Sequence, residues 1–135
     1  MGHWGVKSYE NDDAGDALDS GFDRVHGETY DDLMDDSNPM TVEQIHKQLA
    51  NPETLTRALD WLNEEFGDDV QAWDEIARLA FVGVIVLHAE MKVSIPDALR
   101  SRAIEWLEGE DIDWDEATLR RLRVANELAL LRRPS

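Results

Sequence analysis

The sequence predicts an all-α fold, a compact helical domain of about six to seven helices, on three observations. Apolar residues recur at three- and four-residue steps along most of the chain, which is the period of an amphipathic helix. Side chains that cap helices stand at the ends of these periodic stretches. The most apolar segment, residues 79–87, carries no charge and lies within the longest periodic stretch. We therefore expect two tandem helical hairpins around a central buried helix over about residues 69–91.

The central helix is predicted from the flanks of its apolar run. Residues 81–86 also favour a strand by composition, so a strand at this place remains the alternative. On both sides, however, the helical period continues, from Val70 and Ile76 to Leu87 and Met91. The centre is apolar on all sides, which indicates burial. It is too short to cross a bilayer, because a spanning helix needs about 20 apolar residues.

The N-terminal part, residues 1–40, is expected to form a segment and a helix that pack on the helical hairpins of residues 41–135. The whole chain would then be one domain. Asn11 or Asp12 would cap the first helix, because a short acceptor side chain satisfies free amides of the first turn. This helix is expected to end at Gly27.

The later elements also begin at recognisable caps. After a short helix or turn over residues 28–36, Thr41 and Gln44 have the spacing of a capping box. Asn51 is followed by a proline, which suits the first position of a helix. The last two helices are expected to begin at residues 94–97 and 113–116, and the second to run to about Leu131.

Two parts of the chain resemble each other. Residues 57–62, RALDWL, match residues 102–107, RAIEWL, and the Trp-Asp-Glu of residues 73–75 recurs at residues 114–116. We interpret these matches as two helical hairpins of common design stacked in tandem, as in a short helical-repeat protein. The alternative is chance similarity, since amphipathic helices share a limited set of residues.

The chain is strongly acidic. Its 135 residues include 30 acidic and 13 basic side chains, with a formal net charge of −17. This charge repels phosphate backbones and anionic membranes, so we expect a basic protein as the partner, and neither nucleic acid nor a membrane. Cysteine is absent, which excludes disulfides and fits a cytoplasmic protein. The first residues also lack the apolar run of a signal peptide. The oligomeric state stays open.

The candidate binding residues lie near the N-terminus, and they are Trp4, Asn11, Asp12, Asp13 and Asp16. Carboxylate and amide oxygens are the ligands that Ca²⁺ and Mg²⁺ prefer. The spacing does not match an EF-hand loop, however, and a helix cap followed by first-turn acids explains the same residues. We therefore assign no metal and no cofactor. Trp4 is expected to anchor the N-terminal segment as a lid on the core.

No catalytic motif is visible. The four histidines lack ligand spacing, and the chain has no P-loop, GxSxG or GxGxxG sequence. His88 falls on an apolar helix face, which predicts a hydrogen-bonded histidine of the core. The one basic zone is expected to pair with acids of the same molecule, and it consists of Arg120, Arg121, Arg123, Arg132 and Arg133.

The start of the chain carries two short motifs. Gly2, Trp4 and Gly5 form an MGxWG opening, and residues 11–16 read NDDAxD. Together they resemble the start of a bacterial family of small proteins of unknown function, over roughly the first twenty residues. Residues 7–9 depart from the glycine-proline-aromatic link of that family and keep only the aromatic residue. The resemblance implies a bacterial origin and lends no activity.

Charge, helical layout and the lack of a catalytic motif favour a non-enzymatic acidic interaction protein of the bacterial cytosol. One specific version is an inhibitor or immunity-type protein that covers a basic enzyme. The alternative is a divalent-metal-dependent enzyme or metal-binding protein that uses the N-terminal acidic cluster. A third class is a structural oligomer built on exposed faces of the hairpins.

Overall fold

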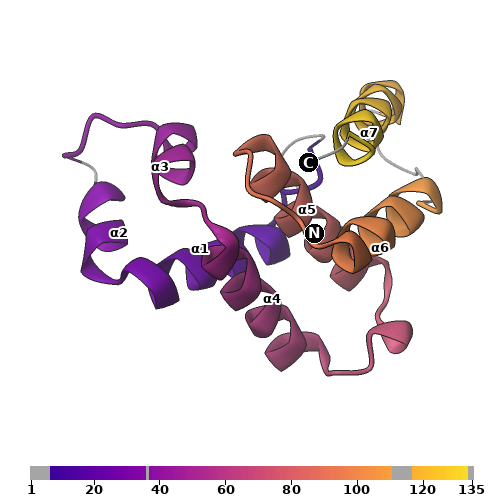
Figure 1. Ribbon diagram of the computed structural model, residues 1–135, viewed down its shortest axis with the longest axis horizontal. Helices are drawn as coiled ribbons and strands as arrows, with labels where there is room; N and C mark the ends of the chain where they lie inside the picture. The colour runs from indigo at the N-terminus through magenta and orange to yellow at the C-terminus, as the bar shows by residue number, and fades with distance from the viewer. Residues whose placement is uncertain (1–6, 36, 111–116, 134–135) are drawn as a thin grey trace.

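The computed structural model describes residues 7–35, 37–110 and 117–133, which form seven α-helices and one short 3-10 turn (Figure 1). The helices are α1 (Asp12–His26), α2 (Glu28–Leu33), α3 (Val42–Leu49), α4 (Pro52–Phe66), α5 (Glu75–Glu90), α6 (Asp97–Glu108) and α7 (Ala117–Leu131). The 3-10 turn η1 (Val70–Ala72) precedes α5. The predicted all-α class with six to seven helices is confirmed.

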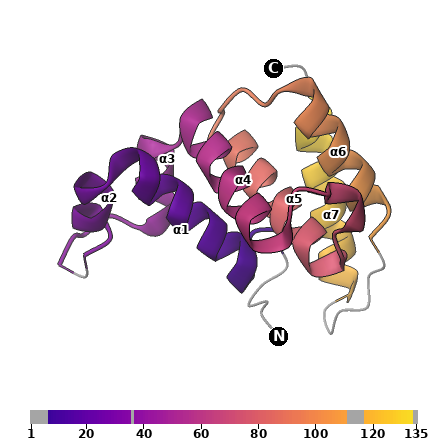
Figure 2. The same cartoon turned by 90° about the horizontal axis from the view of Figure 1, so that it is seen from below.

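Helix α5 lies at the centre and contacts α1, α4, α6 and α7. Figures 1 and 2 show α1 and α4 on one side of it and α6 and α7 on the other, with α2 and α3 at the far end of α1. Residues 80–88 are all buried, because a helix that is apolar on every side must be surrounded by others. Because residues 81–86 lie within α5, the strand alternative is wrong. None of the helices in the described ranges has the length and apolarity of a bilayer-crossing segment.

The central helix is shorter than predicted, since α5 begins at Glu75 and not near Asp69. The chain before it is extended at Trp73, whose indole N–H donates to the Gly67 carbonyl at 3.0 Å. Asp74 then caps α5 by accepting a hydrogen bond from a first-turn amide at 2.9 Å. The apolar period upstream of Glu75 thus comes from the 3-10 turn and its tryptophan packing on the core, and not from a continuous helix.

The caps predicted for α1, α3 and α4 agree with the sequence, whereas α6 begins after Pro96 without a side-chain cap. The Asn11 side chain caps α1, and α3 begins with the predicted capping box. Asn51 caps α4 and exchanges hydrogen bonds with Thr54, which makes a second capping box. The cap expected at residues 113–116 lies outside the described residues, as does Trp114 of the internal match, so the repeat stays a prediction.

Helix α1 packs along α4, a pairing that the sequence did not indicate (Figure 2). The contact is centred on Gly21. A Cβ atom added there would meet the backbone nitrogen of Ala58 and the carbonyl oxygen of Thr54, each at 2.8 Å. The two helix backbones therefore approach more closely than any side chain at residue 21 permits. Helix α1 therefore packs as a third helix against the predicted hairpin of α4 and α5.

A second close approach occurs at Gly83, in the middle of α5. A Cβ atom at this position would lie 2.5 Å from the carbonyl oxygen of Ser8 and 2.8 Å from the Cα of Tyr9. The segment that precedes α1 thus crosses directly over the backbone of the central helix. Glycine is required here by the approach of another backbone, not by an unusual φ angle.

Gly83→Ala is expected to lower the free energy of unfolding by about 1–3 kcal/mol, because the added methyl group has no space under the segment. Gly109→Ala is the matched control, since the nearest atom to a Cβ there is the Glu105 carbonyl oxygen at 3.4 Å. Urea unfolding followed by tryptophan fluorescence measures both. Equal stabilities of the two variants would contradict the close packing at Gly83.

Candidate functional site

The predicted N-terminal residues divide into a helix cap and a group of surface acids. Asn11 is buried, and its side chain accepts a hydrogen bond from a first-turn amide at 2.9 Å. Its amide group donates to the Ser8 carbonyl at 2.6 Å. The fold therefore uses both ends of this side chain, and Asn11 is a structural residue. Asp12 and Asp13 occupy the first turn of α1, and Trp4 lies outside the described residues.

Asp13 lies where carboxylates from separate parts of the chain approach one another. Partial burial raises the pKa of its carboxyl group, and the negative charges of neighbouring acids raise it further. Those neighbours are Asp16, Asp12, Asp74 and Glu65, in decreasing order of effect. They belong to α1, to the cap of α5 and to the end of α4. We call these five residues the acidic patch.

The sequence indicated only the part of the patch that is contiguous. Asp74 and Glu65 lie far from Asp13 in sequence, and the packing of α1 on α4 and α5 brings them together. In the part of the chain that the structure describes, no three histidine, aspartate or glutamate side chains are arranged to hold a metal ion.

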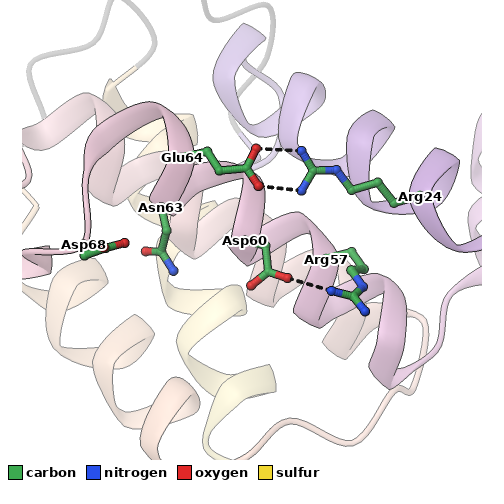
Figure 3. A pocket seen from close by; sticks show the side chains of 6 residues that line it. All are labelled: Arg24, Arg57, Asp60, Asn63, Glu64 and Asp68. Atoms are coloured by element: carbon green, nitrogen blue, oxygen red, sulfur yellow. Dashed lines mark hydrogen bonds and ion pairs between the residues drawn. The ribbon is translucent and has the colours of Figure 1, made fainter.

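A shallow hollow along α1 and α4 presents a second polar surface (Figure 3). Its side chains are Arg24, Arg57, Asp60, Asn63, Glu64 and Asp68. Arg24 donates two hydrogen bonds of 2.8 Å to Glu64 and thereby lowers the pKa of that carboxyl group. Arg57 pairs with Asp60 at 3.2 Å. Both cations of the hollow are engaged within the molecule, and acids outnumber them.

A network of charges lies inside the protein, between α7 and the segment before α1. Arg120 and Glu127 are both completely buried, with 3.6 Å between Nη1 and Oε1. Glu127 also accepts from Arg123 at 2.8 Å and from the backbone N–H of Ser8 at 3.0 Å. Arg120 donates to Glu110 at 2.9 Å and to the Ser8 hydroxyl oxygen at 3.0 Å. The internal pairing expected for the basic zone is confirmed for these arginines.

The arrangement of Ser8 and Glu127 has the elements of a nucleophile beside a base, but it cannot act as one. The Ser8 hydroxyl donates to Glu127 and accepts from Arg120, and all three residues are fully buried. A substrate would have no access to the oxygen. The neighbouring Tyr9 hydroxyl donates to Glu90 at 2.7 Å. Burial is the larger cause that raises the pKa of Tyr9, and this hydrogen bond is the second. The network therefore fixes the N-terminal segment on α5 and α7.

A second buried polar group surrounds Phe22. The ring of His46 stacks on Phe22 with 4.8 Å between centroids, and that of His88 lies 6.0 Å away. Nδ1 of His88 is 2.8 Å from the Val84 carbonyl, which can only accept, so Nδ1 carries the proton. Nε2 lies 2.9 Å from the Thr54 hydroxyl oxygen, whose single proton is shared between this nitrogen and the Asn51 carbonyl at 2.8 Å. Burial lowers the pKa of both histidines to about 4, so both are neutral. The hydrogen-bonded core histidine predicted at residue 88 is confirmed.

Comparisons of this chain with models of known protein families, with curated proteins and with solved structures find no match. The N-terminal resemblance to a bacterial family of unknown function therefore stays a prediction.

Glu127→Gln is expected to cost about 1–3 kcal/mol of unfolding free energy, because it removes the charge from the acceptor of Arg123 and Ser8 and leaves Glu110 as the remaining carboxylate beside Arg120. Glu105→Gln on an exposed position of α6 is the matched control, and its effect should stay within about 0.5 kcal/mol. Guanidinium unfolding at neutral pH measures the two losses. A cost for Glu127→Gln as small as that of the control would show that the buried pair is not formed.

His46→Phe is expected to reduce the acid sensitivity of the fold while keeping a ring on Phe22. The folded pKa of about 4 lies below the unfolded value of about 6.5, so the unfolded state binds more protons. The stabilisation from His46 is therefore complete above pH 6.5 and is lost as the pH falls through 4. Between these values the wild type should lose stability relative to the variant by at most about 1.4 kcal/mol per pH unit.

The measurement is the difference between the two proteins in urea unfolding from pH 7.5 to pH 4. The difference is needed because the raised pKa of Asp13 acts in the opposite direction and stabilises the fold at low pH in both proteins. A difference that does not change with pH would contradict a neutral, partly buried His46.

Proposed function

We propose that the protein is a non-enzymatic interaction protein of the bacterial cytosol that binds a basic protein partner through the acidic patch. The observation that carries the proposal is the position of Asp13, where partial burial and then the charges of acids in α1, the α5 cap and α4 raise the pKa of one carboxyl group. A cationic side chain placed over this surface would relieve that repulsion. The fold thus holds a surface whose energy falls when a basic group approaches.

The long-range field supports the same kind of partner. The net charge of −17 attracts a basic protein and accelerates its diffusional encounter, most strongly at low ionic strength. In the hollow beside α1 and α4, Arg24 and Arg57 are paired within the molecule. Each of these pairs neutralises one acid locally, so the hollow offers a basic partner less negative charge than the acidic patch does.

The perturbed groups of the molecule favour binding over catalysis. A catalytic acid or base has to reach a substrate. The groups with strongly shifted pKa values are Tyr9, Tyr30, His46 and His88, and they pack within the core or against it. Their shifts come first from burial. They are therefore explained by packing.

A specific form of the proposal is an inhibitor or immunity-type protein that covers a basic enzyme. Its support is the charge and the small size of the chain. A gene for a basic nuclease beside the gene for this protein would strengthen it, and an isolated gene would count against it.

The triple variant Asp13→Asn, Asp16→Asn, Glu65→Gln is expected to lose the partner while keeping the fold. Asp74 is left unchanged because it caps α5. Each exposed charge contributes up to about 1 kcal/mol, so three together should weaken binding by about tenfold or more. The assay measures how much of the basic partner each variant captures from a bacterial lysate at about 50 mM and at about 500 mM salt. The higher salt concentration largely screens attraction between surface charges.

The matched control is Glu43→Gln, Glu53→Gln, Glu105→Gln, which removes the same charge from exposed positions outside the patch. A basic protein should be captured by the wild type and the control at low salt, and lost by the triple variant. Equal capture by the triple variant, or no captured basic protein at low salt, would refute the proposal.

A further inference from the structure

The acidic patch lies at the start of α5, and a pocket lined by basic residues lies at the other end of this helix. It lies where the ends of α5 and α7 meet the loop that leads into α6, and it encloses about 350 Å³. Its apolar side is formed by Ala89, Val93, Ile95, Leu130 and Leu131. Lys92, Arg100 and Arg133 line it as well, and no acidic residue of the described ranges does. On a chain with a net charge of −17, three cations around an apolar floor are a local exception.

Lys92 occupies a backbone conformation that disfavours its side chain. Its φ angle is +63°, in the left-handed region, and no other described residue apart from glycine has a positive φ. The Lys92 N–H donates to the Ala89 carbonyl at 3.0 Å, and the Val93 N–H donates to the His88 carbonyl at 2.9 Å. This is the Schellman motif that ends a helix, in which glycine usually takes the left-handed position. A lysine there retains a cation at the pocket despite the strain.

The other two cations hold the pocket in shape and add charge. Arg100 donates to the backbone carbonyl of Arg133 at 3.3 Å and pairs with Asp97, which ties the start of α6 to the end of α7. The charged ends of Lys92 and Arg133 make no ion pair within the described residues, and both residues are exposed. These two charges are therefore placed to meet an anion from solution.

We propose that this pocket binds a small amphipathic anion, an aliphatic carboxylate with a short chain. The chain would lie on Ile95 and Leu131, which are almost completely buried, and the carboxylate would meet Lys92 and Arg133. The volume is at the lower end of the range for small-molecule sites, which fits one short chain. The field of the whole protein repels anions, so binding of one requires these local cations. This inference does not depend on the acidic patch.

The test is a titration of the full chain with octanoate. Isothermal calorimetry and the methyl NMR signals of Ile95 and Leu131 monitor the binding. Saturable binding that shifts these signals is expected. Octanamide, which lacks the charge, and acetate, which lacks the chain, should each bind at least about tenfold more weakly, because each loses one half of the contact. Octanamide or acetate binding as tightly as octanoate would overturn the proposal.

Lys92→Gly separates binding from folding. Glycine relieves the left-handed strain, so the melting temperature should stay the same or rise, while octanoate binding weakens by about tenfold through loss of a charge-assisted contact. Arg133→Ala should weaken binding to a similar degree. Lys47→Ala on α3, away from the pocket, is the control and should bind as the wild type does. Unchanged octanoate affinity in Lys92→Gly, or no saturable binding by the wild type, would refute the site.

Discussion

The position of the N-terminal segment depends on one buried ion pair, between Arg120 and Glu127 of α7. Removing two charges from water costs several kcal/mol per ion, and the pair alone does not offset this cost. Further groups satisfy the remaining polar atoms: Ser8 and, within α7, Arg123 bond to Glu127, and Glu110 and Ser8 bond to Arg120. The charges of α7 are therefore stable only when the chain before α1 lies across them.

Two glycines make that arrangement possible. Gly83 lets the backbone at Ser8 lie on α5, and Gly21 lets α1 lie on α4. Both contacts place backbone against backbone, where a methyl group would have to displace the chain. The surface follows from this core, because the same packing brings Asp13 of α1 to Asp74 and Glu65. The arrangement of acids on the surface is thus set by helix contacts in the interior, from which solvent is excluded.

The two ends of α5 carry surfaces with different physical roles. At its start, the acidic patch adds to the field of a chain with net charge −17, and such a field acts over a Debye length of about 8 Å or more. At its end, Lys92 and Arg133 stand beside an apolar floor and oppose that field only locally. A large basic partner responds to the first kind of surface. A small anion can use the second, because contact and burial decide its binding.

The sequence by itself determined the helices and most of their starts. Asn11 and Asn51 act on amides within one turn, and the helical period on both sides of residues 79–87 favours a helix over a strand there, so both effects are local. Only the tertiary structure decided that α5 starts at Glu75, because Trp73 packs against Trp106 of α6 and the chain turns there before the helix begins. It also decided which charges are buried. Ser8 and Glu127 are 119 positions apart, and no local pattern records the meeting of residues so distant in sequence.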